Sequence, residues 1–325
     1  MTDSAAAPVV VPAEIRMDLL ENGLDEIASA VEHLGAAPTP RALKRAVTEL
    51  AGGVELILKE RLRRHDWRQL FDDVAVANEG DLRRGDFISP AGGEVLRRLR
   101  EGAGVTLPNR HRKRLDALRR RRNRIEHFAL IDTVEAVRTS TAGCLSVVID
   151  FIVDRLGVDT LTPTERELFE KVREALPRLE AYAIARRQDI ATVLAEAGAA
   201  ATVVSCPSCD EAALVLDGTA TCLFCRYHAD PVAAADDFIG EVPGLVEYVE
   251  VTQGGEWPRH TCPECDADAL VDTGGDGDDR HICFSCGTTW RDGQIERCAR
   301  CGEPLEVEGE LSVCNGCQAS LADRE

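Results

Sequence analysis

Aliphatic side chains recur every three or four positions through most of the first 200 residues, which is the period of an amphipathic helix. In the segment 41–65, for example, Leu43, Val47 and Leu50 would lie on one buried face. The periodicity predicts helices over 13–34, 41–65, 91–101, 109–130 and 131–156, a shorter element over 67–77 and a loop over 80–90.

A further helix is expected to begin at residues 162–165, whose sequence is Thr-Pro-Thr-Glu. This sequence forms a capping box with proline at the first helical position. The helix should continue to about residue 197 as a spacer, with Pro177 as a potential kink.

Beyond Cys206 the helical period gives way to short β-like runs between cysteine turns, for example at 213–216, 305–307 and 311–313. Gly287 and Gly302 directly follow the second cysteine of their turns, where the chain is expected to need a positive φ. The predicted fold class is therefore mainly α, with an N-terminal helical bundle, a spacer helix and C-terminal tandem small β ribbons. The predicted domains are a disordered start at 1–12, the bundle at 13–160, the connecting helix at 161–200, ribbons at 201–230, 258–293 and 294–325, and a linker at 231–257.

The composition favours helices packed through aliphatic side chains, because aromatic residues make up only 4% of the chain. The short Ala/Val run of the first eleven residues has no basic region before it, so it does not resemble a signal peptide. The most apolar later stretch, 142–153, is too short to span a bilayer and contains Asp150. We expect a cytoplasmic protein with no membrane association and with reduced thiols.

Twelve of the thirteen cysteines form six Cys-x-x-Cys pairs, all in the last 120 residues. In order, they make three four-cysteine sets with 12, 17 and 12 residues between the two pairs of each set. Each set is predicted to hold one structural Zn²⁺. Redox-active pairs are the alternative, and crossed pairing between the second and third sets is also open. The predicted ligands are Cys206, Cys209, Cys222, Cys225, Cys262, Cys265, Cys283, Cys286, Cys298, Cys301, Cys314 and Cys317.

Charge is distributed unevenly along the chain, whose formal net charge is −19. Residues 1–160 carry 25 Lys/Arg and 25 Asp/Glu, whereas residues 201–325 carry 7 against 25. A surface as acidic as the predicted ribbons repels phosphate backbones. The ribbons are therefore not expected to bind DNA or RNA, and a protein partner is the better candidate.

The segment 110–124 holds nine Lys/Arg and one Asp, and such a run is often no more than a solvated or RNA-attracting face. Its apolar positions form a stripe, and Arg122 occupies the position that would complete it. An arginine there lowers stability unless it has a buried partner or a site to serve. Asn123 and His127 are four residues apart and share another face. Guanidinium, carboxamide and imidazole together are the groups needed to cleave RNA without a metal.

The sequence Arg122-Asn123-x-x-x-His127 resembles the Arg-x₄₋₆-His motif of HEPN-domain ribonucleases, including the polar residue after the arginine. The resemblance extends over about residues 40–157. Arg120 and Arg121 also have an allowed spacing to His127, and Asn123 favours Arg122. The resemblance implies a homodimer with both motifs at the interface, forming a composite site that cuts single-stranded RNA. Many members of the family are toxins or act in phage defence, some of them controlled by an antitoxin.

The predicted function is thus a metal-independent endoribonuclease acting on single-stranded RNA, with Arg122, Asn123 and His127 as catalytic residues. The acidic ribbons would bind a protein partner or restrain the nuclease. The alternative is a non-catalytic dimeric adaptor that binds RNA or protein and carries structural zinc ribbons. DNA binding through the ribbons is disfavoured by their charge.

Overall fold

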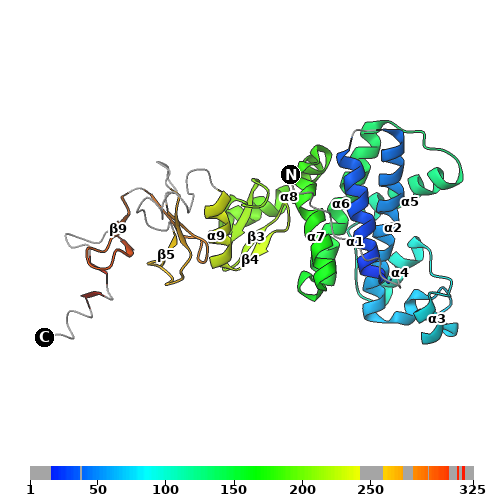
Figure 1. Ribbon diagram of the computed structural model, residues 1–325, viewed down its shortest axis with the longest axis horizontal. Helices are drawn as coiled ribbons and strands as arrows, with labels where there is room; N and C mark the ends of the chain where they lie inside the picture. Colours follow the sequence, from blue (N-terminus) through cyan, green and yellow to red (C-terminus); the bar gives the residue numbers. More distant parts are fainter. Residues whose placement is uncertain are drawn as a thin grey trace, which may run out of the picture. The chain divides into compact units, whose positions relative to one another are not determined.

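The computed structural model describes residues 16–36, 39–241, 259–273, 281–291, 293–306, 313–314 and 317–318. The chain divides into two compact units, Met1–Ala175 and Leu176–Glu325 (Figure 1). The first unit is helical, and the second combines helices with small antiparallel sheets that carry the cysteine clusters. The predicted fold class, mainly α with small cysteine-rich β modules at the C-terminal end, is confirmed. The domain boundaries proposed from the sequence stay predictions.

The N-terminal unit is built from helices joined by short turns. Its α-helices are α1 (Leu19–Gly35), α2 (Pro40–His65), α3 (Glu79–Arg84), α4 (Gly92–Glu101), α5 (Asn109–His127), α6 (Val134–Phe151) and α7 (Pro163–Ala175). Short 3-10 turns lie at Trp67–Leu70, Val74–Val76 and Val158–Thr160, and a π-helical turn at Ile152–Leu156 extends α6.

Helix α2 is central to this unit, because it contacts α1, α4, α5 and α6, while α7 packs against α1. The apolar positions predicted for α2 are buried, as are those of α1 from Leu24 to Leu34. Helices α1 and α2 run side by side (Figure 1) and approach closely at two glycines. A Cβ on Gly53 would lie 2.7 Å from the carbonyl oxygen of Gly23 and 2.7 Å from Cγ1 of Ile27. The close approach therefore requires glycine at position 53.

Helix α4 is anchored by Arg98, which is buried. Its guanidinium donates to the carbonyls of Phe71 at 2.6 Å and Asp72 at 2.7 Å, and to the carboxylate of Glu94 at 2.7 Å. These charge-assisted bonds satisfy backbone oxygens of the segment between α2 and α3. They hold α4 beside the start of that segment.

Two helix starts in this unit differ from the prediction. Helix α1 begins at Leu19 because the Asp18 carboxylate caps it, accepting from the N–H of Leu20 at 3.0 Å; residues 13–15 of the predicted helix lie outside the described residues. The loop predicted over 80–90 is wrong at its start, since α3 lies there. The Asn78 side chain caps α3, and Gly85, with φ of 68°, ends it.

The later helices also end where local capping dictates. Helix α5 ends at His127, not near residue 130, because Phe128 leaves the helical region with φ of −150° and ψ of −85°. The capping box predicted at 162–165 is confirmed: the Thr162 N–H donates to the Glu165 carboxylate at 2.7 Å. The single helix predicted from there is interrupted, because a 3-10 turn containing Pro177 separates α7 from the next helix.

Among the described residues, one segment, Val134–Leu156, is long and apolar enough to cross a membrane, with a mean hydropathy of 1.5 in its most apolar window. Two-thirds of that window, 67%, is buried inside the protein. Helix α6, which makes up most of the segment, packs against α2 and α5. The expectation that the apolar stretch at 142–153 is too short to span a bilayer is therefore wrong on length, because the helix extends beyond it on both sides. The buried core helix of a soluble protein passes the same test of length and composition.

The C-terminal unit begins with a long helix and continues through three ribbons. Two ribbons are four-stranded antiparallel sheets, ordered β1-β2-β3-β4 and β5-β6-β7-β8, and the third contains the hairpin β9-β10. The elements are α8 (Glu180–Ala200), β1 (Thr202–Ser205), β2 (Ala212–Leu216), β3 (Ala220–Cys222), β4 (His228–Ala229), α9 (Pro231–Glu241), β5 (Arg259–His260), β6 (Leu270–Asp272), β7 (His281–Cys283), β8 (Thr289–Trp290), β9 (Ile295–Arg297) and β10 (Pro304–Glu306).

Of the β-like runs predicted from the sequence, 213–216 falls on β2, and residues 305 and 306 of the second run fall on β10. Residue 307 and the start of the third run, at 311–313, lie outside the described residues. Helix α9 occupies the start of the segment predicted as a linker; Asp230 caps it by accepting from the N–H of Ala233 at 3.0 Å. The rest of that segment to residue 257 lies outside the described residues.

The first two ribbons contact one another through backbone groups. The N–H of Gly218 donates to the carbonyl of Ser285 at 3.0 Å, and the Thr202 hydroxyl donates to the carbonyl of Gly287 at 2.6 Å. The second and third ribbons are joined by Trp290, whose indole N–H donates to the Glu306 carboxylate at 2.7 Å. Successive ribbons therefore support one another.

Candidate functional site

The Cys-x-x-Cys turns share one backbone pattern. In each of the first five, the backbone N–H of the first cysteine donates to the carbonyl of the residue five positions later. The backbone N–H of the residue after the second cysteine donates to the carbonyl of the first cysteine. That residue has a positive φ in all five turns, which confirms the prediction for Gly287 (74°) and Gly302 (81°). The turn imposes the same conformation on Asp210, Arg226 and Asp266. Each turn directs two sulfur atoms to one centre.

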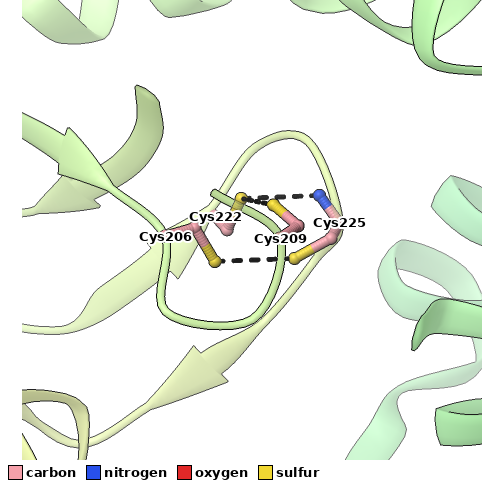
Figure 2. Close-up of side chains that lie close together, drawn as sticks. All are labelled: Cys206, Cys209, Cys222 and Cys225. Atoms are coloured by element: carbon pink, nitrogen blue, oxygen red, sulfur yellow. Dashed lines mark hydrogen bonds between the residues drawn. The ribbon is translucent and has the colours of Figure 1, made fainter. Parts of the chain in front are cut away.

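Figure 2 shows the first cluster, where Cys206 and Cys209 meet Cys222 and Cys225. The sulfur atoms of Cys206 and Cys225 are 3.7 Å apart, and those of Cys209 and Cys222 are 3.9 Å apart. Four sulfur ligands held tetrahedrally at about 2.3 Å from one ion would be separated by about 3.8 Å. Disulfide sulfurs lie at about 2.05 Å, so these thiols are not paired covalently. The cluster has the size and shape of a closed tetrahedral metal site.

The second and third clusters repeat this geometry. Sulfur separations are 3.7 and 3.8 Å in the second and 3.6 Å in the third. In every set the four ligand atoms lie within 4.8 Å of one another. The cysteines therefore group in sequence order, and the crossed pairing of the second and third sets is excluded. The remaining cysteine, Cys144, is buried and its thiol bonds the Arg114 carbonyl, which agrees with a core role.

Hydrogen bonds favour the thiolate form at one position of the second and third clusters. The Cys262 thiol, followed by the backbone N–H groups of Cys286 and Ser285, lowers the pKa of Cys283 to about 5. Backbone N–H groups of Cys314 and Cys301 lower the pKa of Cys298 to about 6. Metal binding needs deprotonated cysteines. Hydrogen bonds from a neighbouring thiol and from the backbone thus favour, at these two positions, the thiolate form that a cation binds.

Helix α8 packs directly on the first cluster, a role that the sequence reasoning missed. Arg186 is 1% exposed and donates to the carbonyls of Phe224 at 2.9 Å and Leu223 at 2.7 Å. These two residues lie between the ligands Cys222 and Cys225. The ring of Tyr182 also contacts Phe224 edge-on, with centroids 6.0 Å apart. The only sequence signal was that Arg186 shares a helix face with the largely apolar residues Tyr182, Ala183 and Ile190.

The residues of the predicted ribonuclease motif lie on the last two turns of α5. Arg122 is half-buried, and its Nε contacts the Glu126 carboxylate at 2.7 Å, while Nη1 donates to the side chain of Asn123 at 3.3 Å. Asn123 and His127 are exposed, and His127 has no hydrogen bond or ion pair with the described residues. The structure brings Arg122 and Asn123 into contact but does not bring His127 to either. Glu126 was missed, although its i+4 spacing from Arg122 signals an ion pair.

The neighbouring arginines differ from Arg122 in their surroundings. Arg121 is nearly buried and pairs with Asp132, from Nη2 at 2.6 Å, and with Ser140. Its guanidinium holds the pKa of the Asp132 carboxyl below the usual value. Arg121 therefore ties α5 to α6 and is not available to a substrate. Arg120 is exposed.

Arg122 also borders a cavity of about 70 Å³ between α2, α4 and α5. The walls are mostly aliphatic and include Leu58, Leu96 and Leu118. Arg122 lines this cavity together with Leu115 and Leu118 of the apolar stripe of α5, which agrees with the prediction that Arg122 completes the stripe. The guanidinium reaches outward to Glu126 instead of entering an apolar core, so the charge stays partly hydrated.

No protein-family model, curated protein or solved structure matches this chain. The likeness to HEPN ribonucleases is therefore carried by the motif residues and the helical pattern alone.

Proposed function

We propose that the chain is a metal-independent endoribonuclease of the HEPN type, cleaving single-stranded RNA in a toxin or phage-defence setting. The observation that carries the proposal is the end of α5, where Asn123 contacts Arg122 and exposed His127 follows one turn later, on a helix with nine basic residues between 110 and 124. An exposed imidazole without a partner among the described residues is free to exchange protons with a substrate.

Each residue has a role in the proposed reaction. His127 removes the proton of a ribose 2′-hydroxyl, whose oxygen attacks the adjacent phosphorus, or donates a proton to the 5′-oxygen as the bond from phosphorus to that oxygen breaks. Arg122 stabilises the negative charge on the phosphate, for which it must exchange Glu126 for the substrate. Asn123 orients substrate or imidazole. The products are a 2′,3′-cyclic phosphate and a 5′-hydroxyl.

The proposal includes a homodimer that juxtaposes two copies of the motif, so that one histidine acts as base and the other as acid. Large apolar side chains directly beyond the motif support it: Phe128 is 85% exposed and Ile131 is 76% exposed. Exposed apolar residues that cluster at one place are typical of an interaction surface. A second copy of the chain would cover them and bring a second His127 to the site.

Zinc is the metal proposed for the three cysteine clusters. Four thiolates in tetrahedral array, with separations matching a metal–sulfur distance of about 2.3 Å, are the ligand set of structural zinc sites. A closed four-thiolate site leaves no position for substrate. The ions would therefore stabilise the ribbons, whose acidic surface, with 7 Lys/Arg against 25 Asp/Glu over 201–325, binds a protein partner or restrains the nuclease.

A second candidate function is a non-catalytic dimeric adaptor that binds RNA or protein and carries the same ribbons. The contacts of the motif favour it: within one chain Arg122 is bound by Glu126 and Asn123, and His127 is not assembled with them. In this function the basic helix would hold RNA without cutting it.

The decisive assay compares the wild type with His127→Ala on a panel of single-stranded RNAs, in EDTA kept brief enough to spare ribbon zinc. Removing a general acid or base is expected to lower the rate by about 10²- to 10⁴-fold. His65→Ala is the matched control, because His65 is also exposed and is likewise the last residue of its helix, α2. Equal cleavage by wild type and His127→Ala, or no cleavage by wild type, would favour the adaptor.

A further inference from the structure

A second cavity, larger than that beside Arg122, lies between α4 and the first turns of α5 and holds about 300 Å³ of space. Part of its wall is aliphatic, with Leu96, Leu99, Val105 and Leu107. The lining also carries the cations of Arg97, Arg100, Arg112 and Lys113. A concave site with an apolar surface and a few convergent charges is typical of ligand-binding pockets, which begin at about this size.

The positive charge of this cleft is only partly neutralised. Lys113 is exposed and makes no hydrogen bond or ion pair with any described residue. The Arg112 side chain has a long contact of 3.5 Å with the uncharged Asn109. Arg97 pairs with Glu94 and Glu101, and Arg100 pairs with Glu101. The one acid of the lining, Asp116, pairs with Arg119 at 3.5 Å. The cleft therefore keeps two cations available to an anionic ligand.

The cleft and His127 share one face of α5, whereas Arg122 lies on the apolar stripe and borders the adjoining cavity. Lys113, Arg120 and His127 follow one another at intervals of seven residues, which is about two helical turns. All three are exposed, and Arg120, like Lys113, has no ion pair with the described residues. The distance along the axis from Lys113 to His127 is about 21 Å. Leu96 and Asp116 line both this cleft and the cavity beside Arg122, so the two hollows adjoin.

We propose that the cleft between α4 and α5 is a subsite for one nucleotide of a single-stranded RNA that lies along α5. The base packs against the aliphatic wall, Arg112 and Lys113 hold its phosphate, and the strand continues past Arg120 to His127. Electrostatic grooves that follow the backbone are how proteins hold single strands without sequence preference. The identity of the ligand rests on the proposed function, whereas the shape and charge of the cleft do not.

The test measures binding of a labelled RNA of about eight nucleotides, a length within the site sizes of single-strand binders. The parent protein is the full chain with His127→Ala, which keeps the RNA intact. Arg112→Ser/Lys113→Ser is compared with a control, Arg41→Ser/Lys44→Ser. The control removes the same charge from exposed positions in the first turns of α2, so it matches the effect on helix polarity.

Losing the contacts to this one phosphate should make the slope of log affinity against log salt shallower by about 0.7, which corresponds to about fivefold weaker binding at about 0.1 M salt. The control should stay within about twofold of the parent. The charge-preserving double variant Arg112→Lys/Lys113→Arg should keep the parental slope, and circular dichroism checks that each variant is folded. Together these results support an RNA subsite at the cleft.

Equal loss of affinity in the cleft variant and the control overturns the subsite and leaves the nuclease proposal standing. A polyglutamate peptide of equal charge that binds the parent as tightly as RNA does also overturns it, in favour of a protein ligand. The parallel cleavage assay separates the two proposals. If wild type does not cut RNA but the cleft variant loses RNA affinity, the subsite survives and the nuclease does not.

Discussion

The two units of the chain hold their structures by different means. In the N-terminal unit, helices pack through aliphatic side chains, and α1 and α2 approach closely enough to require Gly53. In the C-terminal unit, short strands carry three cysteine clusters, and one small core is formed by two of the ligands, Cys262 and Cys283, with Leu270 and Trp290. Small domains with little core need staples such as metals or disulfides. The comparison predicts that the two units respond to different perturbations.

Removing metal should have the largest effect, and it should fall on the C-terminal unit alone. We expect three zinc ions per chain, each worth about 10–16 kcal/mol of folding free energy. A strong chelator should therefore unfold the ribbons while far-ultraviolet circular dichroism still reports the helices of the N-terminal unit. Cys209→Ser should lower the zinc content to two ions per chain. Clearly fewer than three ions in the wild type would contradict the proposal.

Cys144→Ser is the matched control for that experiment, because Cys144 is the one cysteine outside the clusters. Its thiol is buried, and burial raises its pKa to about 12. It should therefore stay protonated and contribute no metal ligand. Zinc content should remain at three ions in this variant, while any change in stability belongs to the helical unit.

Arg186 offers a sharper test, because it joins a helix to a metal centre. Arg186→Ala would leave the carbonyls of Leu223 and Phe224 without their charged donor. Each lost hydrogen bond should reduce the folding stability by about 1.5–3 kcal/mol. We expect faster release of one zinc ion out of three to a colorimetric chelator. Arg187→Ala is the control: its side chain is 57% exposed, so its pair with Glu211 and its contact with the Phe224 ring, 5.9 Å from the guanidinium carbon to the ring centroid, should each contribute at most about 1 kcal/mol.

If Arg186→Ala and Arg187→Ala release zinc at the same rate as the wild type, α8 is a spacer after all. If both release it faster, general destabilisation of the helix explains the result better than the buried contact. Only a selective effect of Arg186→Ala on one ion supports a structural link between α8 and the first cluster.

The sequence was most informative where chemistry dictates spacing. The cysteine pairs predicted the clusters and their grouping, because two thiols separated by two residues can bind one ion. The left-handed residues of the turns were readable only at Gly287 and Gly302. At Asp210 and Arg226 the same conformation is imposed by the turn, and local sequence preference does not reveal it.

At the candidate ribonuclease site the sequence was less informative, because it did not reveal the partners of the charged side chains. Sequence placed Arg122 on the apolar stripe and Asn123 with His127 on another face, and both placements agree with the burial of α5. It did not predict that Glu126 forms an ion pair with Arg122, nor that Asp132 forms one with Arg121. Partners in an arginine-rich helix depend on which carboxylates the fold brings near, and Asp132 lies beyond the end of the helix. The pairing of arginines with carboxylates therefore depends on the tertiary structure.

The smallest predicted effect concerns two adjacent glycines of α2 and should appear only in the helical unit. A Cβ at position 53 would lie 2.7 Å from a backbone oxygen and from Ile27, so Gly53→Ala must push α1 away. Overpacking of this kind costs about 1–3 kcal/mol, part of which the better helix propensity of alanine offsets. At position 52 the nearest atom is the flexible Glu26 carboxylate at 3.4 Å, so Gly52→Ala should stabilise by about 0.5–1 kcal/mol.

In thermal unfolding of the helical unit, Gly53→Ala should lower Tm and Gly52→Ala should raise it. Each kcal/mol of changed stability should shift Tm by about 2–4 °C. Zinc content should stay the same in both variants, because neither glycine lies in the unit that holds the clusters. A loss of zinc on Gly53→Ala would mean that the packing of α1 and α2 also supports the ribbons. Equal Tm values for the two variants would mean that α1 moves aside without loss, and that close backbone approach is not what holds the bundle together.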